Sequence, residues 1–202
     1  MALLGANGVG KTTLLRILAG LAKPSAGTVS IEGLDSIQDA QQIRRLVGFV
    51  AHQPNVYEEL TALENLLFFG RMYGVEHTQE RARHLLERVC LEKRCHERVS
   101  TFSRGQMQRL AWIRALLHSP RLLLLDEADA GLDQEGDKLV ETFLAEQTAQ
   151  GGSVLFTTHQ FERALRLSDR IVIIAKGSVV YQGETKLLGL EGIQQAYKEA
   201  IR

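Results

Sequence analysis

The stretch Gly5-Ala6-Asn7-Gly8-Val9-Gly10-Lys11-Thr12 decides the fold, because it fits the phosphate-binding loop pattern G-x-x-x-x-G-K-[S/T]. Glycines allow such a loop to turn tightly and to point successive backbone N–H groups at a chain of phosphates. Apolar residues follow at helical spacing within 14–18, so the loop opens a helix whose N-terminus adds a partial positive charge. A glycine-rich turn would match this pattern by accident in about one percent of chains of this length.

The residue types in this loop have separate roles toward a nucleotide. Lys11 can reach the oxygens of the β- and γ-phosphates, and Thr12 can offer its hydroxyl to a Mg²⁺ ion. The residues that we expect to hold the nucleotide here are Gly5, Asn7, Gly8, Gly10, Lys11, Thr12 and Thr13.

Composition argues against several classes of protein. The 202 residues carry 24 Lys and Arg against 24 Asp and Glu, so no net charge favours nucleic acid or anionic lipid as a partner. No apolar run approaches the length of about 18 residues that a membrane span needs, and the start lacks the layout of a signal peptide. Cys90 and Cys95 form no C-x-x-C pair, which favours a reduced cytosolic setting.

Strand and helix patterns alternate along most of the chain. Strands are predicted for residues 28–32, 46–52, 122–126, 154–158, 170–175 and 178–182. Helices are predicted for residues 11–21, 62–73, 79–89, 104–117, 135–148 and 162–167. This alternation predicts an α/β fold with a parallel sheet covered by helices. The segment 61–103 has helical patterns only, so we expect an α-helical subdomain inserted into the core.

Two acidic residues form a second element of the phosphate site. Four leucines at 122–125, apolar on both faces as a central parallel strand requires, run directly into Asp126 and Glu127. Ligands of open parallel sheets bind beyond the carboxyl ends of the strands. Asp126 would hold Mg²⁺ through water, and Glu127 would orient or deprotonate the attacking water, although Asp126 could instead cap the following segment. Together with the loop, this Walker-B arrangement predicts a P-loop NTPase core.

The stretch Thr101-Phe102-Ser103-Arg104-Gly105-Gln106-Met107-Gln108-Arg109-Leu110 resembles the signature sequence of ABC-type ATPases. It stands just before the strand that carries Asp126, as in that family. Ser103 suits a helix N-cap, so its hydroxyl, the Gly105 N–H and the helix dipole form an anion site, although an ordinary capped helix would have the same sequence features. The resemblance implies that Ser103, Gly105 and Gln106 bind the γ-phosphate of ATP held by a second ATP-binding subunit.

Three further segments match the family in order. Gln53 follows the strand 46–52, as the Q-loop glutamine does, which implies contact with Mg²⁺ or water. His159 ends the strand 154–158 and resembles the switch histidine that holds the γ-phosphate and the attacking water. Gly131-Leu132-Asp133 resembles the D-loop, which crosses the dimer interface. The catalytic residues implied by the resemblance are Glu127, His159 and Gln53. The implied Mg²⁺ ligands are Thr12, Gln53 and Asp126.

The chain departs from the family pattern in and around these motifs. Arg104 stands in place of one glycine of the usual Gly-Gly pair, and Phe102 in place of the usual Leu. A side chain at 104 is tolerable where the backbone is helical, because helical φ is negative. Ala128 replaces the proline that often follows the catalytic Glu. We expect activity to survive these changes.

Only residues 1–4 precede the loop, whereas family members carry further N-terminal strands and an aromatic residue that stacks on adenine. Loss of that stacking would weaken ATP binding by about 1–3 kcal/mol, by analogy with stacking on nucleic-acid bases. Without those strands, we also expect an unpaired sheet edge and a domain less stable than a longer relative.

The resemblance extends over residues 1–202 and implies an ATP-binding and hydrolysing subunit that powers a membrane permease. Such a subunit lies peripherally on the cytoplasmic face of the membrane and forms a head-to-tail homodimer or heterodimer around two ATP molecules. Residues 47–53, 57–66 and 101–110 are most similar to the ATP-binding subunit of the haem exporter of cytochrome c maturation (CcmA type). The alternatives are the ATPase of a multidrug or antibiotic exporter and a soluble ABC ATPase without a transport role.

Overall fold

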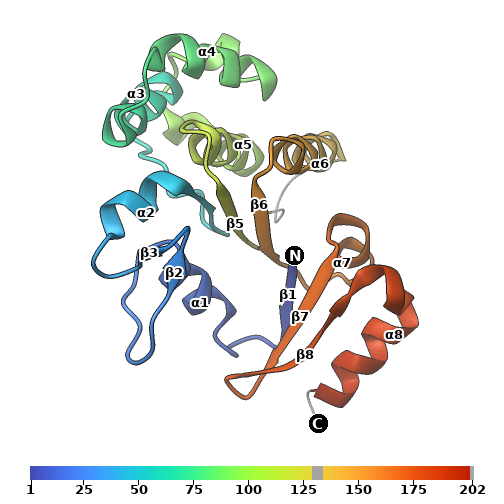
Figure 1. Cartoon of the computed structure of the whole chain (residues 1–202). Coiled ribbons are helices and arrows are strands. Elements are labelled where there is room, and N and C mark those ends of the chain that lie inside the picture. The colour runs from blue at the N-terminus through green and yellow to red at the C-terminus, as the bar shows by residue number, and fades with distance from the viewer. Residues whose placement is uncertain (129–133, 201–202) are drawn as a thin grey trace.

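A computed structural model of the chain describes residues 1–128 and 134–200 (Figure 1). Within this part of the chain, a six-stranded sheet has the strand order β4-β5-β6-β1-β7-β8. Its strands are β1 (Ala2–Gly5), β4 (Val47–Val50), β5 (Leu122–Asp126), β6 (Ser153–Thr157), β7 (Arg170–Ala175) and β8 (Ser178–Glu184). All neighbouring strands pair in parallel except β8, an edge strand that pairs antiparallel with β7. The predicted α/β fold with a parallel sheet is confirmed, with β8 as the antiparallel exception.

Helices cover both faces of this sheet, because successive apolar side chains of each strand point to opposite faces. The helices are α1 (Lys11–Leu18), α2 (Ala40–Leu46), α5 (Arg104–Leu116), α6 (Gln134–Ala149), α7 (Phe161–Leu167) and α8 (Thr185–Ala200). Leu3 and Leu124 belong to the core under α1 and α2. Leu4, Leu123 and Leu125 belong to the larger core on the other face, under α5, α6, α7 and α8. The two cores make β1 and β5 central, and both strands carry predicted site residues at their carboxyl ends.

The segment 61–103 holds α3 (Ala62–Tyr73), α4 (Thr78–Arg88) and the 3-10 turns η1 (Glu92–Arg94) and η2 (Val99–Thr101). Helix α3 begins at a capping box, in which Thr61 Oγ1 accepts from Glu64 N at 3.1 Å and Glu64 Oε2 accepts from Thr61 N at 2.8 Å. Figure 1 shows α3 and α4 beyond α5, away from the sheet. Their buried Leu66 and Leu86 join the core of α5. We propose that this segment is the expected inserted subdomain.

The structure corrects the prediction for residues 28–32. Instead of a strand of the main sheet, this region forms only β2 (Ser30–Ile31), which pairs with β3 (Leu34–Asp35) in a separate two-stranded hairpin. Glu32 and Gly33 join the two strands with φ values of 53° and 80°. Positive φ at both central residues is typical of the tight type I′ hairpin turn.

Two helices were not predicted from the sequence. Helix α2 is short and polar, and Ile43 is the one residue that it buries, so its apolar periodicity is weak. Helix α8 contains Gly189, whose φ of 60° and ψ of −178° bend the helix. Glycine disfavours a helix interior, which hides the helical pattern of this segment.

His118, just beyond α5, is packed as a neutral ring. Its Nε2 lies 3.1 Å from the Val47 carbonyl oxygen and donates to it, and its ring stacks on Tyr73 with centroids 4.1 Å apart. Its Nδ1 is buried and has no hydrogen-bond partner among the described residues. Protonation would place a buried N–H there with nothing to accept it. Burial therefore lowers the pKa of His118 from 6.5 to about 4, against the opposing effect of the Val47 carbonyl.

This buried ring predicts a loss of stability in mild acid. Because the pKa of His118 is lower in the folded than in the unfolded chain, its contribution is complete above pH 6.5 and falls as the pH drops toward 4. Between these two pH values, the parent protein should lose about 2 kcal/mol more unfolding free energy than the variant His118→Phe, which keeps an aromatic ring beside Tyr73. Urea unfolding of both proteins at several pH values measures this difference. Equal pH dependence of the two would contradict the assignment.

Candidate functional site: a nucleotide site at the sheet edge

The phosphate-binding loop connects β1 to α1 at the carboxyl edge of the sheet. Gly5 ends β1 against β7, where an added Cβ would lie 2.6 Å from the Ile174 carbonyl oxygen, so only glycine fits. Gly10 is the N-cap of α1 with φ 104°, a value that side chains disfavour, and no side-chain hydrogen bond caps this helix. Asn7, Gly8, Thr12 and Thr13 are exposed. The open loop and the uncapped first turn therefore leave backbone N–H groups accessible to an anion.

Lys11 is folded back onto its own loop. Its side chain is only 6% exposed, and Nζ donates to the carbonyl oxygens of Gly5 at 2.8 Å and Ala6 at 3.0 Å. Burial lowers the pKa of Lys11, whereas the nearby carboxylates of Glu127 and Asp126 act to raise it. The ammonium group is therefore held at the loop, between the loop carbonyls and the two acids.

Asp126 ends β5 and is fixed by a neighbour that the sequence reading missed. Parallel pairing places Asp126 beside Thr157 of β6, and Thr157 Oγ1 donates to Asp126 Oδ1 at 3.0 Å. The same hydroxyl accepts from the Glu127 N–H at 3.0 Å. Asp126 is only 6% exposed, so this contact orients a largely buried carboxylate. The sequence offered one hint of this role: Thr157 lies in the predicted strand 154–158 and stands two residues before His159.

Glu127 and His159 meet beyond the ends of β5 and β6. His159 Nε2 lies 2.6 Å from Glu127 Oε1, and the two side chains are 44% and 36% exposed. Both groups are therefore paired with each other and open to a ligand. A histidine hydrogen-bonded to a carboxylate can orient that carboxylate toward a water molecule, which is the geometry that a general base requires.

A cleft of about 750 Å³ opens beside Asp126, between the helix α1 and the segment around Gln53. Its lining includes Thr12, Gln53 and Asp126, the three residues predicted to hold Mg²⁺. A hydroxyl, an amide oxygen and a carboxylate are hard oxygen donors, and Mg²⁺ prefers such donors together with phosphate oxygens. No group of three His, Cys, Asp or Glu side chains that could hold a metal ion gathers anywhere in residues 1–128 and 134–200. The donor set at this cleft therefore fits the predicted ion.

The signature stretch forms the N-terminus of α5. Ser103 is the N-cap: its Oγ accepts from Gln106 N at 3.3 Å, and Gln106 Oε1 accepts from Ser103 N at 3.0 Å. Gly105 lies in the first helical turn. These three residues do not line the cleft that Thr12 and Asp126 share. The predicted phosphate ligands of one subunit therefore come from two elements, the loop before α1 and the first turn of α5.

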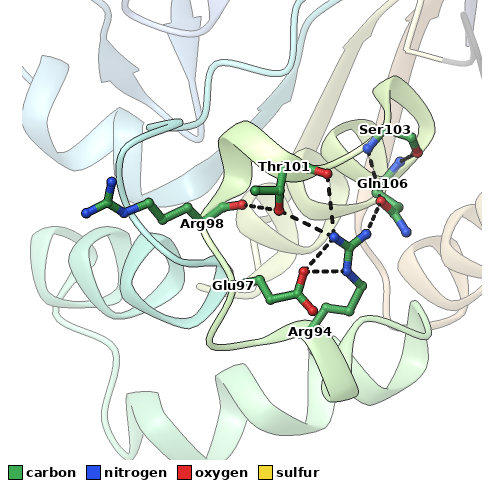
Figure 2. Close-up of polar contacts among 6 residues, drawn as sticks. All are labelled: Arg94, Glu97, Arg98, Thr101, Ser103 and Gln106. Atoms are coloured by element: carbon green, nitrogen blue, oxygen red, sulfur yellow. Dashed lines mark hydrogen bonds and ion pairs between the residues drawn. The ribbon is translucent and has the colours of Figure 1, made fainter.

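A polar network supports this capped turn (Figure 2). Arg94 Nη1 donates to Gln106 Oε1 at 2.7 Å, and Arg94 Nε donates to Glu97 Oε2 at 2.8 Å. Arg94 Nη2 also lies 3.3 Å from Thr101 Oγ1. Arg94 therefore contacts Glu97 and Thr101 before α5 and Gln106 within it. These contacts hold the Gln106 side-chain carbonyl in place. Sequence reasoning did not select Arg94, because a lone arginine in a polar segment has no motif.

The structure shows what Arg104 and Phe102, which depart from the family pattern, contact. Arg104 is the first residue of α5, so its backbone is helical and the condition for tolerating a side chain there is met. Its Nη2 lies 3.1 Å from His52 Nε2, in the segment that leads to Gln53. Phe102 is buried, 6% exposed, beneath the Arg94 guanidinium. The predicted D-loop, residues 131–133, lies outside the described residues.

These features together define a nucleotide-binding domain: an open phosphate loop at a helix N-terminus, tandem acids at the end of β5, and a histidine beyond β6, the strand between β5 and β1, that pairs with the second acid. A family model described as "ABC transporter" matches residues 1–130. The chain belongs to this family, and it is an ABC ATPase domain.

Named relatives in curated proteins agree with this membership. The ABC transporter ATP-binding protein NatA of Bacillus subtilis is 34% identical over 92% of this chain and 77% of its own length. The Nod factor export ATP-binding protein I of Paraburkholderia xenovorans is 40% identical over 92% of this chain and 62% of its own length. The linearmycin resistance ATP-binding protein LnrL of Bacillus subtilis is 33% identical over 99% of this chain and 69% of its own length. The chain therefore spans between 62 and 77% of these relatives.

A solved structure shows the same fold. The dimeric structure of a post-hydrolysis state of the ATP-binding cassette MJ0796, bound to ADP and Pi, is 31% identical, with a TM-score of 0.82. The similarity covers 91% of this chain and 84% of that chain. In residues 1–128 and 134–200, no helix combines the length and apolar character that crossing a bilayer demands.

Proposed function

We propose that this chain is the ATP-hydrolysing subunit of an ABC exporter, bound to the cytoplasmic face of a membrane through an integral-membrane permease. The observation that carries this proposal is that the predicted phosphate ligands come from two helix N-termini, the loop with Lys11 before α1 and the turn with Ser103 before α5. Each group is half of a nucleotide site. Two subunits in head-to-tail arrangement would complete two sites.

Hydrolysis would use the groups at the ends of β5 and β6. Glu127 would accept the proton of the attacking water, held in place by His159 at 2.6 Å. Lys11 would turn from the loop carbonyls to the β- and γ-phosphates. Thr12, Gln53 and Asp126 would hold Mg²⁺, which neutralises charge on the phosphate oxygens when bound.

An exposed aromatic surface, formed by Tyr57 before α3 and Phe68 on α3, supports the proposal of a permease partner. Tyr57 and Phe68 are 50% and 40% exposed, and their rings pack edge to face with centroids 5.1 Å apart. A shallow groove beside them is lined by Tyr57, Glu58, Glu59, Leu60 and Phe68. Exposed aromatic residues with an acidic rim suit an amphipathic segment that carries a basic residue. We therefore assign the permease contact to this face.

The direction of transport rests on the relatives. One of them is named for Nod factor export and another for linearmycin resistance, and these names favour outward transport. Haem export for cytochrome c maturation, predicted from residues 47–53, 57–66 and 101–110, is a second candidate. An ATPase of a multidrug or antibiotic exporter is a third. A soluble ABC ATPase without a permease would leave the exposed aromatic surface of Tyr57 and Phe68 without a role.

The test is stimulation of ATP hydrolysis by an ABC exporter permease from the organism that encodes this chain, reconstituted with it in lipid nanodiscs. We expect the permease to raise turnover, and Phe68→Ser to remove this stimulation while leaving the turnover of the free subunit within about twofold of the parent's. Leu187→Ser, which alters an exposed apolar residue of α8 outside the groove, is the control. Haem, a Nod factor and linearmycin added in turn would distinguish the substrates. An ATP hydrolysis rate that is the same with and without the permease would contradict the transport role.

A further inference from the structure

Helix α5, which begins beside Ser103, also holds the backbone next to Glu127. Gln108 of this helix is only 1% exposed, and its Nε2 donates to the Ala128 carbonyl oxygen at 2.9 Å and to the Ala51 carbonyl oxygen at 3.3 Å. An amide NH₂ group carries two hydrogens, and these two contacts use both. Trp112, one turn further along α5, donates from Nε1 to the same Ala128 oxygen at 3.1 Å.

The Ala128 contact matters because Glu127 has a disfavoured backbone. Its φ of 49° is left-handed, a conformation that residues with a Cβ rarely adopt unless their surroundings fix it. On one side, the Glu127 N–H donates to Thr157 Oγ1 at 3.0 Å. On the other side, Gln108 and Trp112 hold the carbonyl of the next residue. The backbone that aims the Glu127 carboxylate is therefore fixed by β6 and by α5 together.

The Ala51 contact connects α5 to the segment that carries Gln53. Ala51 lies two residues before Gln53, and Arg114 of α5 holds the same segment further along the helix. Arg114 Nη2 donates to the Phe49 carbonyl oxygen at 2.8 Å, and Arg114 Nη1 donates to the Asn55 carbonyl oxygen at 2.6 Å. Both ends of the segment 49–55 are thus fastened to the helix that starts at Ser103.

We propose that Gln108 is a positioning residue for hydrolysis: it fixes Glu127 and Gln53 of a subunit's own site to the helix whose first turn meets the partner's ATP. This inference rests on the proposed function. A movement of Ser103 onto a partner's γ-phosphate shifts α5 as a rigid helix. The two carbonyls that Gln108 holds then shift with it, so the partner's nucleotide adjusts the geometry at Glu127.

The variant Gln108→Leu tests this role, because leucine has a similar volume and no donor. Gln147→Leu is the matched control: Gln147 is also buried, on α6, and donates from Nε2 to the Pro120 carbonyl oxygen at 2.8 Å. For Gln108→Leu, we expect kcat to fall by about tenfold or more while KM for ATP stays within about twofold. Both variants lose one buried hydrogen-bond donor, so we expect their melting temperatures to fall by similar amounts. For Gln147→Leu, however, kcat should stay within about twofold of the parent's.

A second variant keeps the proposal testable if Gln108→Leu does not fold. Trp112→Phe keeps an aromatic ring beside Phe143 and removes only the donor to Ala128, so kcat should fall by about threefold with KM unchanged. If the parent hydrolyses ATP and kcat of Gln108→Leu and Trp112→Phe equals that of Gln147→Leu, the positioning role is wrong and the proposed function stands. A folded parent protein without ATP hydrolysis would overturn both.

Discussion

Glu127→Gln is expected to lower the turnover of ATP by about a thousandfold and to leave ATP affinity within about threefold of the parent's. Glu127 is the acid that can take a proton from water, since its carboxylate is 36% exposed at the end of β5 and is held by His159 at 2.6 Å. An amide has nearly the same shape and can still bond to His159, but it is not a base at neutral pH. Single-turnover hydrolysis and equilibrium binding of ATP separate the two effects.

The matched control for this change is Glu141→Gln. Glu141 pairs with Arg166 at 2.9 Å on the surface between α6 and α7, and an exposed pair of this kind contributes little to stability. Its turnover should equal that of the parent. If Glu127→Gln hydrolysed ATP at the rate of Glu141→Gln, Glu127 would not be the general base.

The second large effect is expected for Lys11→Ala, which should weaken ATP binding by about a hundredfold, because hydrogen bonds from a charged donor to phosphate are among the strongest in proteins. Lys11 is the cation that the loop carbonyls of Gly5 and Ala6 keep beside the phosphate site. Isothermal titration with ATP measures the affinity directly. Lys186→Ala removes an exposed lysine on α8 and should leave the affinity unchanged. If both variants bound ATP with equal affinity, Lys11 would not be a ligand of the phosphates.

Much of the fold followed from local sequence patterns. The bounds of β5 and α3 agree with those predicted, since four leucines before an acid and a Thr-x-x-Glu capping box are strong local signals. The sheet order and the antiparallel β8 could not be predicted, because strand neighbours depend on contacts between distant segments. Helix α8 was hidden by Gly189, and α2 by its polar surface.

The motif residues of the site could be predicted from the sequence. The residues that hold them in place, Thr157, Arg94 and Gln108, could not. Thr157 reaches Asp126 only because β5 and β6 pair in a particular register, and Arg94 reaches Gln106 only through the folding of η1 and η2. Gln108 lies in the signature stretch, but its two carbonyl partners are distant in sequence. Each of these contacts joins elements that the chain brings together after folding.

The central claim is that each nucleotide site is completed by two subunits of a dimer, one giving the phosphate loop and the other the signature turn. Mixing Lys11→Ala with Ser103→Ala subunits tests this claim most directly. Each variant alone should be inactive, because every site in its dimer lacks either the lysine or the serine. In a mixed dimer, one site combines the intact loop of one subunit with the intact signature turn of the other. Turnover should therefore return to about a quarter of the parent's, since half of the dimers are mixed and each has one intact site. A mixture no more active than its separate components would contradict the head-to-tail arrangement.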